Sequence, residues 1–320
     1  MRAERLFAFL ALPVLASAIL CGCTAGPGDT RNLRVDLGKS DPERLMRFYM
    51  GAVDGAGGDS ILVSGQGRLA VRHDALAEYV GFDPDQNSDN VLDWEELTAL
   101  VEETYNADGR IPETLDALRE QFAYDDTSAF VVEVIGTMSV ATRRIYVPRN
   151  AIVEALQNFD STRRAVIYAE GTTIVGEHLL DGRIVEVTAM TKRADGYWDF
   201  FVYGAEGRLA DSTSTDPRPL HAPIQCAGCH FGNRTFEPEK SFPAVAPDGP
   251  DGPRVFLSNT PGVTTELVSY FDEHRRRSDT VLGIYATLYV GRLIDRARRG
   301  TISDEERALL DQVGAPGTSH

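Results

Sequence analysis

The stretch RIVEVTAMTKRADGYWDFFVY, from Arg183 to Tyr203, decides the fold. β-Branched and aromatic residues fill its two apolar runs, and Ala194-Asp195-Gly196 between them is a turn sequence. The stretch therefore predicts two antiparallel strands joined by a hairpin. A period of two places five side chains on one face of the first strand: Ile184, Glu186, Thr188, Met190 and Lys192.

Similar patterns extend this sheet and add helices around it. Residues 130–147 and 165–175 are rich in β-branched residues, and Asn150 begins a short helical pattern between them. Beyond a proline-rich loop over residues 242–253, helices are predicted to begin at Thr260, at Ser278 or Asp279, and after Ser303, where Glu306 completes a capping box. The sequence thus predicts an α+β fold with a C-terminal helical extension.

The N-terminus has the pattern of a secretory signal peptide, predicted over residues 1–22. Arg2 and Arg5 precede an apolar run over residues 6–20 that is too short for a membrane span. The end of the run resembles a bacterial lipobox, in which Cys23 would carry lipid; Cys21 fits less well, and ordinary signal cleavage is the alternative. We therefore expect an outer-membrane lipoprotein on the periplasmic side of the cell envelope, bound to the membrane through its lipid alone.

Composition limits the classes of function. The formal net charge of −16 argues against nucleic acid as a partner, and the acidity is strongest between Asp83 and Glu120. Outside the signal region only Cys226 and Cys229 remain, so the chain has no disulfide-rich framework.

Residues 85–96, DQNSDNVLDWEE, follow the order of an EF-hand calcium loop. Six positions would supply the oxygen ligands that Ca²⁺ prefers: Asp85, Asn87, Asp89, the Val91 carbonyl, Asp93 and Glu96. Asn90 replaces the usual glycine at the sixth position. Asparagine is tolerable there because it enters the left-handed backbone region more readily than most residues. The preceding helix, over residues 75–80, is less regular, and no equally good second loop lies nearby. We expect a structural calcium ion; an Asp/Asn-rich turn that only caps a helix is the alternative.

The stretch QCAGCHF, over residues 225–231, contains a Cys-x-x-Cys-His motif. A disulfide and a zinc site are alternatives, but no βαβ unit is predicted for a redox disulfide, and zinc would need distant ligands. In the heme c interpretation every residue has a role: Cys226 and Cys229 form thioethers to the heme, and His230 is an axial ligand of the iron.

The other axial position has no obvious ligand. No methionine follows His230, and the remaining candidates are Met46, Met50, Met138, Met190, His178, His221 and His274. A vacant or water-bound position favours ligand binding or redox chemistry. The alternative is a six-coordinate periplasmic electron-transfer cytochrome.

Several short stretches between Ala129 and Phe256 together resemble the cytochrome P-460 and cytochrome c′-beta family. They are YAEGTTIV from Tyr168, VTAMTK from Val187, DGYWDFFVYG from Asp195, the heme motif and Val255-Phe256. The resemblance implies a β-sheet-rich domain with five-coordinate heme, a pocket for nitric oxide or hydroxylamine-type compounds, and a redox partner protein.

The same resemblance suggests roles for residues of the pocket. Gly176 occupies the position of the lysine that is joined to heme in the P-460 branch, so the c′-beta branch fits better. Trp198, Phe200 and Phe201 are candidate pocket aromatics, and His178 would share a strand face with Gly176 and approach the distal side. For Lys192 a surface role is expected.

These inferences divide the chain into five segments: a signal peptide over 1–22, a tether over 23–40, a helical EF-hand-like region over 41–125, a P-460-like heme domain over 126–258 and a helical extension over 259–320. The expected function is that of an exported monoheme c-type cytochrome with a calcium-stabilised region. A calcium-stabilised envelope interaction protein, in which the heme is incidental, is a further alternative.

Overall fold

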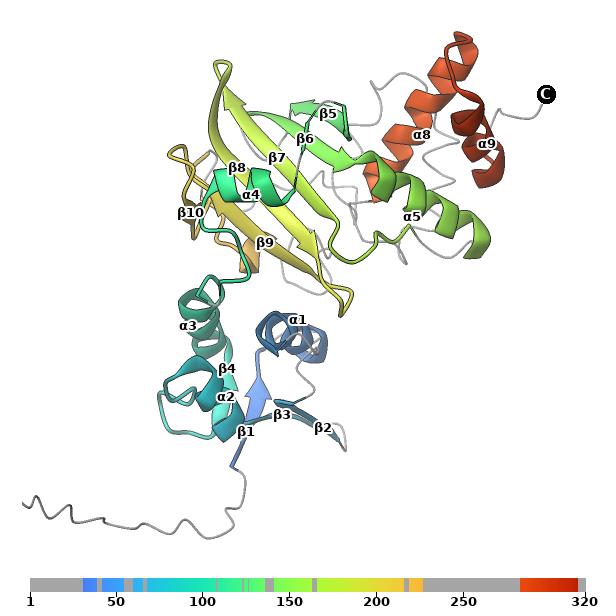
Figure 1. Ribbon diagram of the computed structural model, residues 1–320. Coiled ribbons are helices and arrows are strands. Elements are labelled where there is room, and N and C mark those ends of the chain that lie inside the picture. The colour runs from blue at the N-terminus through green and yellow to red at the C-terminus, as the bar shows by residue number, and fades with distance from the viewer. Residues whose placement is uncertain are drawn as a thin grey trace, which may run out of the picture.

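In the described part of the chain, two β-sheets organise the fold, one of four strands near the N-terminus and one of six strands after it (Figure 1). This computed structural model describes residues 31–38, 42–54, 60–65, 68–107, 109–122, 124–125, 127–135, 141–162, 166–215, 219–226 and 283–315. Antiparallel strands combined with several helices make the fold α+β, which confirms the predicted fold class.

The first sheet has the strand order β2-β3-β1-β4. Its strands are β1 (Asn32–Asp36), β2 (Leu62–Gly65), β3 (Arg68–Arg72) and β4 (Val91–Asp93), and the helices that accompany it are α1 (Pro42–Asp54), α2 (His73–Val80) and α3 (Trp94–Thr104). β1 pairs antiparallel with β3 and parallel with β4.

This sheet changes the expected organisation of the N-terminal region. β1 lies inside the interval expected to be tether. Its Leu33 and Val35 are both buried, and the residues on either side of them are exposed. β2, β3 and β4 lie inside the region expected to be helical. Each of these strands has only three to five residues, which is too short for alternation to stand out against the charged residues within it.

The six-stranded sheet is an antiparallel meander with the order β10-β9-β8-β7-β6-β5. Its strands are β5 (Ala129–Ile135), β6 (Thr142–Pro148), β7 (Thr173–Leu180), β8 (Arg183–Lys192), β9 (Trp198–Tyr203) and β10 (Leu209–Ala210). The predicted hairpin is confirmed, with Lys192 opposite Trp198. The strand expected over residues 165–175 starts later, at Thr173, after a turn in which Gly171 has φ of 78°.

The register of this sheet defines two faces. The histidine face carries Ile174, Gly176, His178, Glu186, Thr188, Met190, Lys192, Trp198 and Phe200. The tyrosine face carries Tyr146, Thr173, Val175, Glu177, Asp199, Phe201 and Tyr203. Phe201 therefore points away from Trp198 and Phe200, so the three aromatics cannot line one pocket together.

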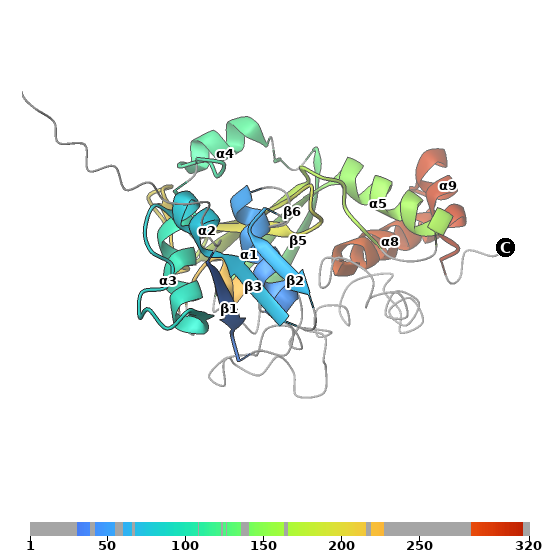
Figure 2. The same cartoon turned by 90° about the horizontal axis from the view of Figure 1, so that it is seen from below.

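Helices from the N-terminal half contact both faces. α4 (Leu115–Gln121) lies over the tyrosine face in both views (Figures 1 and 2). On that face the Tyr203 hydroxyl donates to the Pro112 carbonyl at 2.7 Å. On the histidine face, α1 brings the Phe48 ring to 6.3 Å from the Phe200 ring.

Three helices gather at the β5–β6 end of the sheet: α5 (Arg149–Thr162), α8 (Gly283–Arg298) and α9 (Asp304–Val313) (Figure 1). The Tyr289 ring of α8 packs edge-on against Phe130 of β5 at 5.2 Å. The predicted capping box of Ser303 and Glu306 is confirmed at the start of α9. These helices are part of the main hydrophobic core, whereas the helix predicted from Thr260 lies outside the described residues.

A buried hydroxyl joins the N-terminal half to the large sheet. The Tyr105 hydroxyl, just after α3, donates to Asp199 at 3.1 Å and accepts the Phe200 N–H at 2.8 Å. Burial and then the nearby Asp199 carboxylate raise the pKa of Tyr105 well above its ordinary value. The hydroxyl therefore stays protonated and keeps both bonds at any physiological pH.

Tyr105→Phe should lower the free energy of unfolding by about 1–3 kcal/mol, because it leaves the Phe200 N–H and one Asp199 oxygen without this partner. Tyr49→Phe is the matched control in heme-free protein, since the buried Tyr49 hydroxyl has no hydrogen-bond partner in the described structure. Urea denaturation measures the free energy of unfolding of the two variants and of the wild type. Equal effects of the two substitutions would contradict the assignment.

Candidate functional site

A buried histidine and carboxylate lie side by side on the histidine face. Nδ1 of His178 is 3.0 Å from Oε1 of Glu186, although it is not aligned for a hydrogen bond, and Nε2 is 3.2 Å from the Thr188 hydroxyl. The strand pairing confirms that His178 and Gly176 share this face. Its approach to a distal heme pocket stays a prediction.

Glu186 is fully buried and accepts several hydrogen bonds. Ser214 and Thr215 each donate a backbone N–H and a hydroxyl to its two oxygens. Burial alone raises the pKa of Glu186, but His178, Ser214 and Thr215 outweigh burial and lower it to about 2. The carboxylate is therefore ionised at neutral pH and holds residues 214–215 against β8.

The residues on either side of this anchor lie close together. Ser212 bridges to His221, and the Ala222 N–H donates to the Asp211 carbonyl at 2.9 Å. Cys226, the first cysteine of the Cys-x-x-Cys-His motif, is half-buried and packed against the hydrophobic core. Cys229 and His230 lie outside the described residues. Glu186 thus anchors residues 214–215, which precede Cys226 in the sequence.

The buried Tyr49 hydroxyl and Trp198 Nε1 have no hydrogen-bond partner among the described residues. Burial, and then the nearby Cys226 thiol, raise the pKa of Tyr49. The Tyr168 ring packs edge-on against Trp198 at 6.0 Å. Unpartnered buried donors are rare in proteins, so each of these two is suited to an acceptor group from a ligand.

Lys192 is buried, not on the surface as expected, and its Nζ lies 5.3 Å from the centre of the Trp198 ring. A Cβ added to Gly176 would come within 3.0 Å of the Thr188 hydroxyl. A lysine therefore does not fit at residue 176 unless Thr188 moves.

The remaining axial-ligand candidates differ in position. Met46 and Met50 are fully buried in α1, whereas His221 is exposed. Met190 is buried on the histidine face beside Phe200. Met138 and His274 lie outside the described residues. Met190 is thus the described methionine that shares a face with His178.

The predicted calcium loop lies between α2 and α3. Asn90 and Ser88 adopt left-handed backbone with φ of 63° and 61°, so asparagine takes the conformation expected of glycine. Leu92 is fully buried in β4, and Asp93 caps α3 in a capping box with Glu96. The chain therefore has the helix–loop–helix course that the sequence pattern predicts.

The loop carboxylates bond to backbone amides in this structure. Asp85 accepts the N–H groups of Asp89 and Asn90 at 3.0 and 3.1 Å, and Glu96 accepts those of Asn87 and Asp93 at 3.3 Å each. Within the described ranges, no three His, Cys, Asp or Glu side chains are close enough together to hold a metal ion. The oxygen donor set has the right chemistry for Ca²⁺, but its carboxylates must turn inward to bind it.

Sequence reasoning missed two side chains beside this loop, an arginine and a histidine. Arg31 forms an ion pair with Asp85. His73 lies 2.9 Å from Asp74 and 2.9 Å from Asp83, and the hydrogen bond to Asp74 is the main reason that the pKa of His73 is raised. Neither residue belongs to the loop motif, so nothing in the local pattern points to them.

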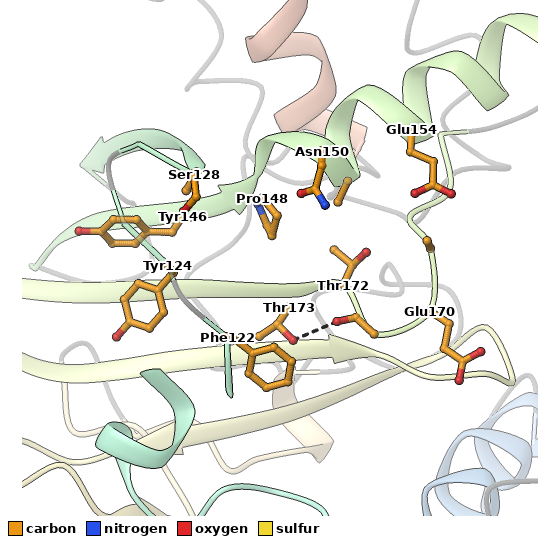
Figure 3. A pocket seen from close by; sticks show the side chains of 14 residues that line it. Phe122, Tyr124, Ser128, Tyr146, Pro148, Asn150, Glu154, Glu170, Thr172 and Thr173 are labelled. Atoms are coloured by element: carbon orange, nitrogen blue, oxygen red, sulfur yellow. Dashed lines mark hydrogen bonds between the residues drawn. The ribbon is translucent and has the colours of Figure 1, made fainter. Parts of the chain in front are cut away.

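A separate cavity of about 320 Å³ lies on the tyrosine face (Figure 3). Tyr124 and Tyr146 lie at one side of it, and Glu154 of α5 and Glu170 lie at the other. None of the residues predicted to bind heme or calcium lines this cavity. It is therefore distinct from the region around Cys226.

The chain was compared with protein families, curated proteins and solved structures. No family model, curated protein or solved structure matches it. Among the described helices, no segment combines the length and hydrophobicity of a membrane span. Function must therefore be inferred from the residues themselves.

Glu186→Gln should lower the free energy of unfolding at pH 7 by roughly 2–4 kcal/mol. The folded-state pKa is about 2 against an ordinary 4.5, so this stability is present above pH 4.5 and is lost as the pH falls toward 2. Denaturation at pH 7 and at pH 3.5 measures the change. The exposed Glu206→Gln is the control, and an equal, pH-independent effect of both substitutions would refute the role of Glu186.

Proposed function

We propose that this protein is an exported monoheme c-type cytochrome whose iron has an open position for a small nitrogen ligand, with a calcium-stabilised N-terminal region. The observation that carries the proposal is the Cys226-x-x-Cys229-His230 motif, whose first cysteine lies near the buried Tyr49 hydroxyl, a donor without a partner among the described residues. Cys226 and Cys229 would hold the heme, and His230 would be its proximal ligand.

The aromatic residues of the histidine face and of α1 suit such a group. Phe48, Trp198 and Phe200 supply aromatic surface on one side of the sheet. The Tyr49 hydroxyl and Trp198 Nε1 supply donors for the acidic edge groups of a porphyrin. Both features suit a flat ring with an apolar body and a few polar substituents.

When bound, heme would supply an iron that binds small ligands and exchanges single electrons. The chain itself would exclude water with the aromatic residues of the histidine face. Ionised Glu186 lies beside the His178 ring, whose Nδ1 is 3.0 Å from Oε1 of Glu186.

A six-coordinate electron carrier is the second candidate function, and the position of Met190 favours it. Met190 is buried on the same face as His178, Trp198 and Phe200. Methionine as the second axial ligand would raise the reduction potential and close the iron to external ligands.

Expression with a c-type heme maturation system should give protein with covalently bound heme, detected by mass spectrometry and heme staining. The double variant Cys226→Ser/Cys229→Ser should lose it completely, because both thioethers are removed. Cys23→Ser is the control and should keep its heme. Absence of covalent heme from the matured wild-type protein would overturn the proposal.

The optical spectrum of the same preparation separates the two candidate functions. An open position predicts rapid binding of carbon monoxide to the reduced protein. A low-spin ferric spectrum and no carbon monoxide complex would instead identify a six-coordinate electron carrier. Met190→Leu should then convert that protein to one that binds carbon monoxide.

Glu96→Gln should weaken calcium binding by at least about tenfold, because it removes one charge from the closing ligand of the loop. Terbium luminescence sensitised by Trp94, with competition by Ca²⁺, measures the affinity. Asp36→Asn is the control, since the exposed Asp36 lies outside the loop and pairs with Arg34. Equal affinities in the Glu96→Gln and wild-type proteins would show that the loop is not the binding site.

A further inference from the structure

The side chain of Arg31 is inserted into the predicted calcium loop. Its guanidinium forms an ion pair with Asp85, and its Nε donates to the Asn90 side-chain oxygen at 2.9 Å. Its Nη1 lies 3.3 Å from Nε2 of His73. Arg31 therefore joins the first and sixth positions of the loop to the start of α2.

The burial of this pair is uneven. The Asp85 side chain has no exposed surface, whereas that of Arg31 is 37% exposed. An ionised carboxylate that is fully buried needs a compensating positive charge. The backbone N–H groups of Asp89 and Asn90 bond to Asp85 but carry no full charge. In the described structure, Arg31 is the fixed positive charge that contacts it.

We propose that Arg31 is an intramolecular competitor of calcium in this loop, an inference that rests on the proposed calcium site. Both cations need the Asp85 carboxylate, and they repel each other at that distance. Ca²⁺ would bind only when the Arg31 side chain leaves Asp85 and Asn90. The contacts of Asp85 agree with this, because the buried carboxylate is engaged by the guanidinium and by two backbone amides of the loop.

The competition would link calcium binding to the start of β1. Arg31 immediately precedes β1, and its carbonyl accepts the His73 N–H at 2.9 Å. This backbone bond does not involve the loop, so the main chain at Arg31 stays attached to α2 when the side chain is displaced. Displacement therefore changes the charge and contacts at the start of β1 without unpairing the strand.

The test compares Arg31→Gln with wild type in calcium titrations followed by terbium competition and by thermal melting. Arg31→Gln should bind calcium about tenfold more tightly or better, since it removes a positive charge next to the ion. Without calcium the variant should melt at a lower temperature, because Asp85 loses its counter-charge. The shift in melting temperature on adding calcium should consequently be larger than in wild type.

Two further variants separate charge from other effects. Arg34→Gln removes a neighbouring β1 arginine that pairs with exposed Asp36, and it should leave the affinity unchanged. Arg31→Lys keeps the charge and should bind calcium with an affinity near that of wild type; it also tests the proposal if Arg31→Gln fails to fold.

The outcomes distinguish this inference from the calcium proposal. If Arg31→Gln lowers the melting temperature but leaves the calcium affinity unchanged, Arg31 is only a structural ion pair and the competition is refuted. If neither wild type nor Arg31→Gln binds terbium or calcium, the calcium site itself is refuted and the competition with it.

Discussion

The buried Glu186 carboxylate is the interaction that ties the segment after β10 to the six-stranded sheet. It is ionised inside the protein because Ser214 and Thr215 of that segment donate to it and His178 of β7 lies beside it. A charge without exposure is stable only with such partners. Glu186 therefore fixes both a histidine on the sheet and the backbone that leads to Cys226.

A second buried carboxylate has the same role in the N-terminal region. Asp85 begins the loop between α2 and α3, and its oxygens organise the turn through backbone amides. The two carboxylates differ in their counter-charge. Glu186 is matched by donors of the segment after β10 and lies beside His178, whereas Asp85 is matched by a partly exposed arginine. Under the proposed competition, that arginine is the partner that a calcium ion would displace.

The sequence predicted the features that depend on local patterns. The β8–β9 hairpin, the shared face of Glu186 and Met190, and the capping box of α9 all follow from alternation or capping within one stretch. The first sheet was missed because its strands are short and β1 joins β4 across the intervening α1 and α2. Arg31 and Tyr49 were missed because nothing near them in sequence shows what they contact; only folding brings Arg31 to Asp85.

The parallel pairing of β1 with β4 has a consequence for how the loop would respond to an ion. In paired EF-hands the short central strands of two loops face each other, and each loop then influences the other. Here Leu92 of β4 lies opposite Val35 of β1, a strand that contains no ligand of its own. No second loop of this kind pairs with it in the described part of the chain. If the loop binds calcium as we propose, its saturation would follow a simple hyperbola, so that its occupancy would rise gradually with the calcium concentration and without a threshold.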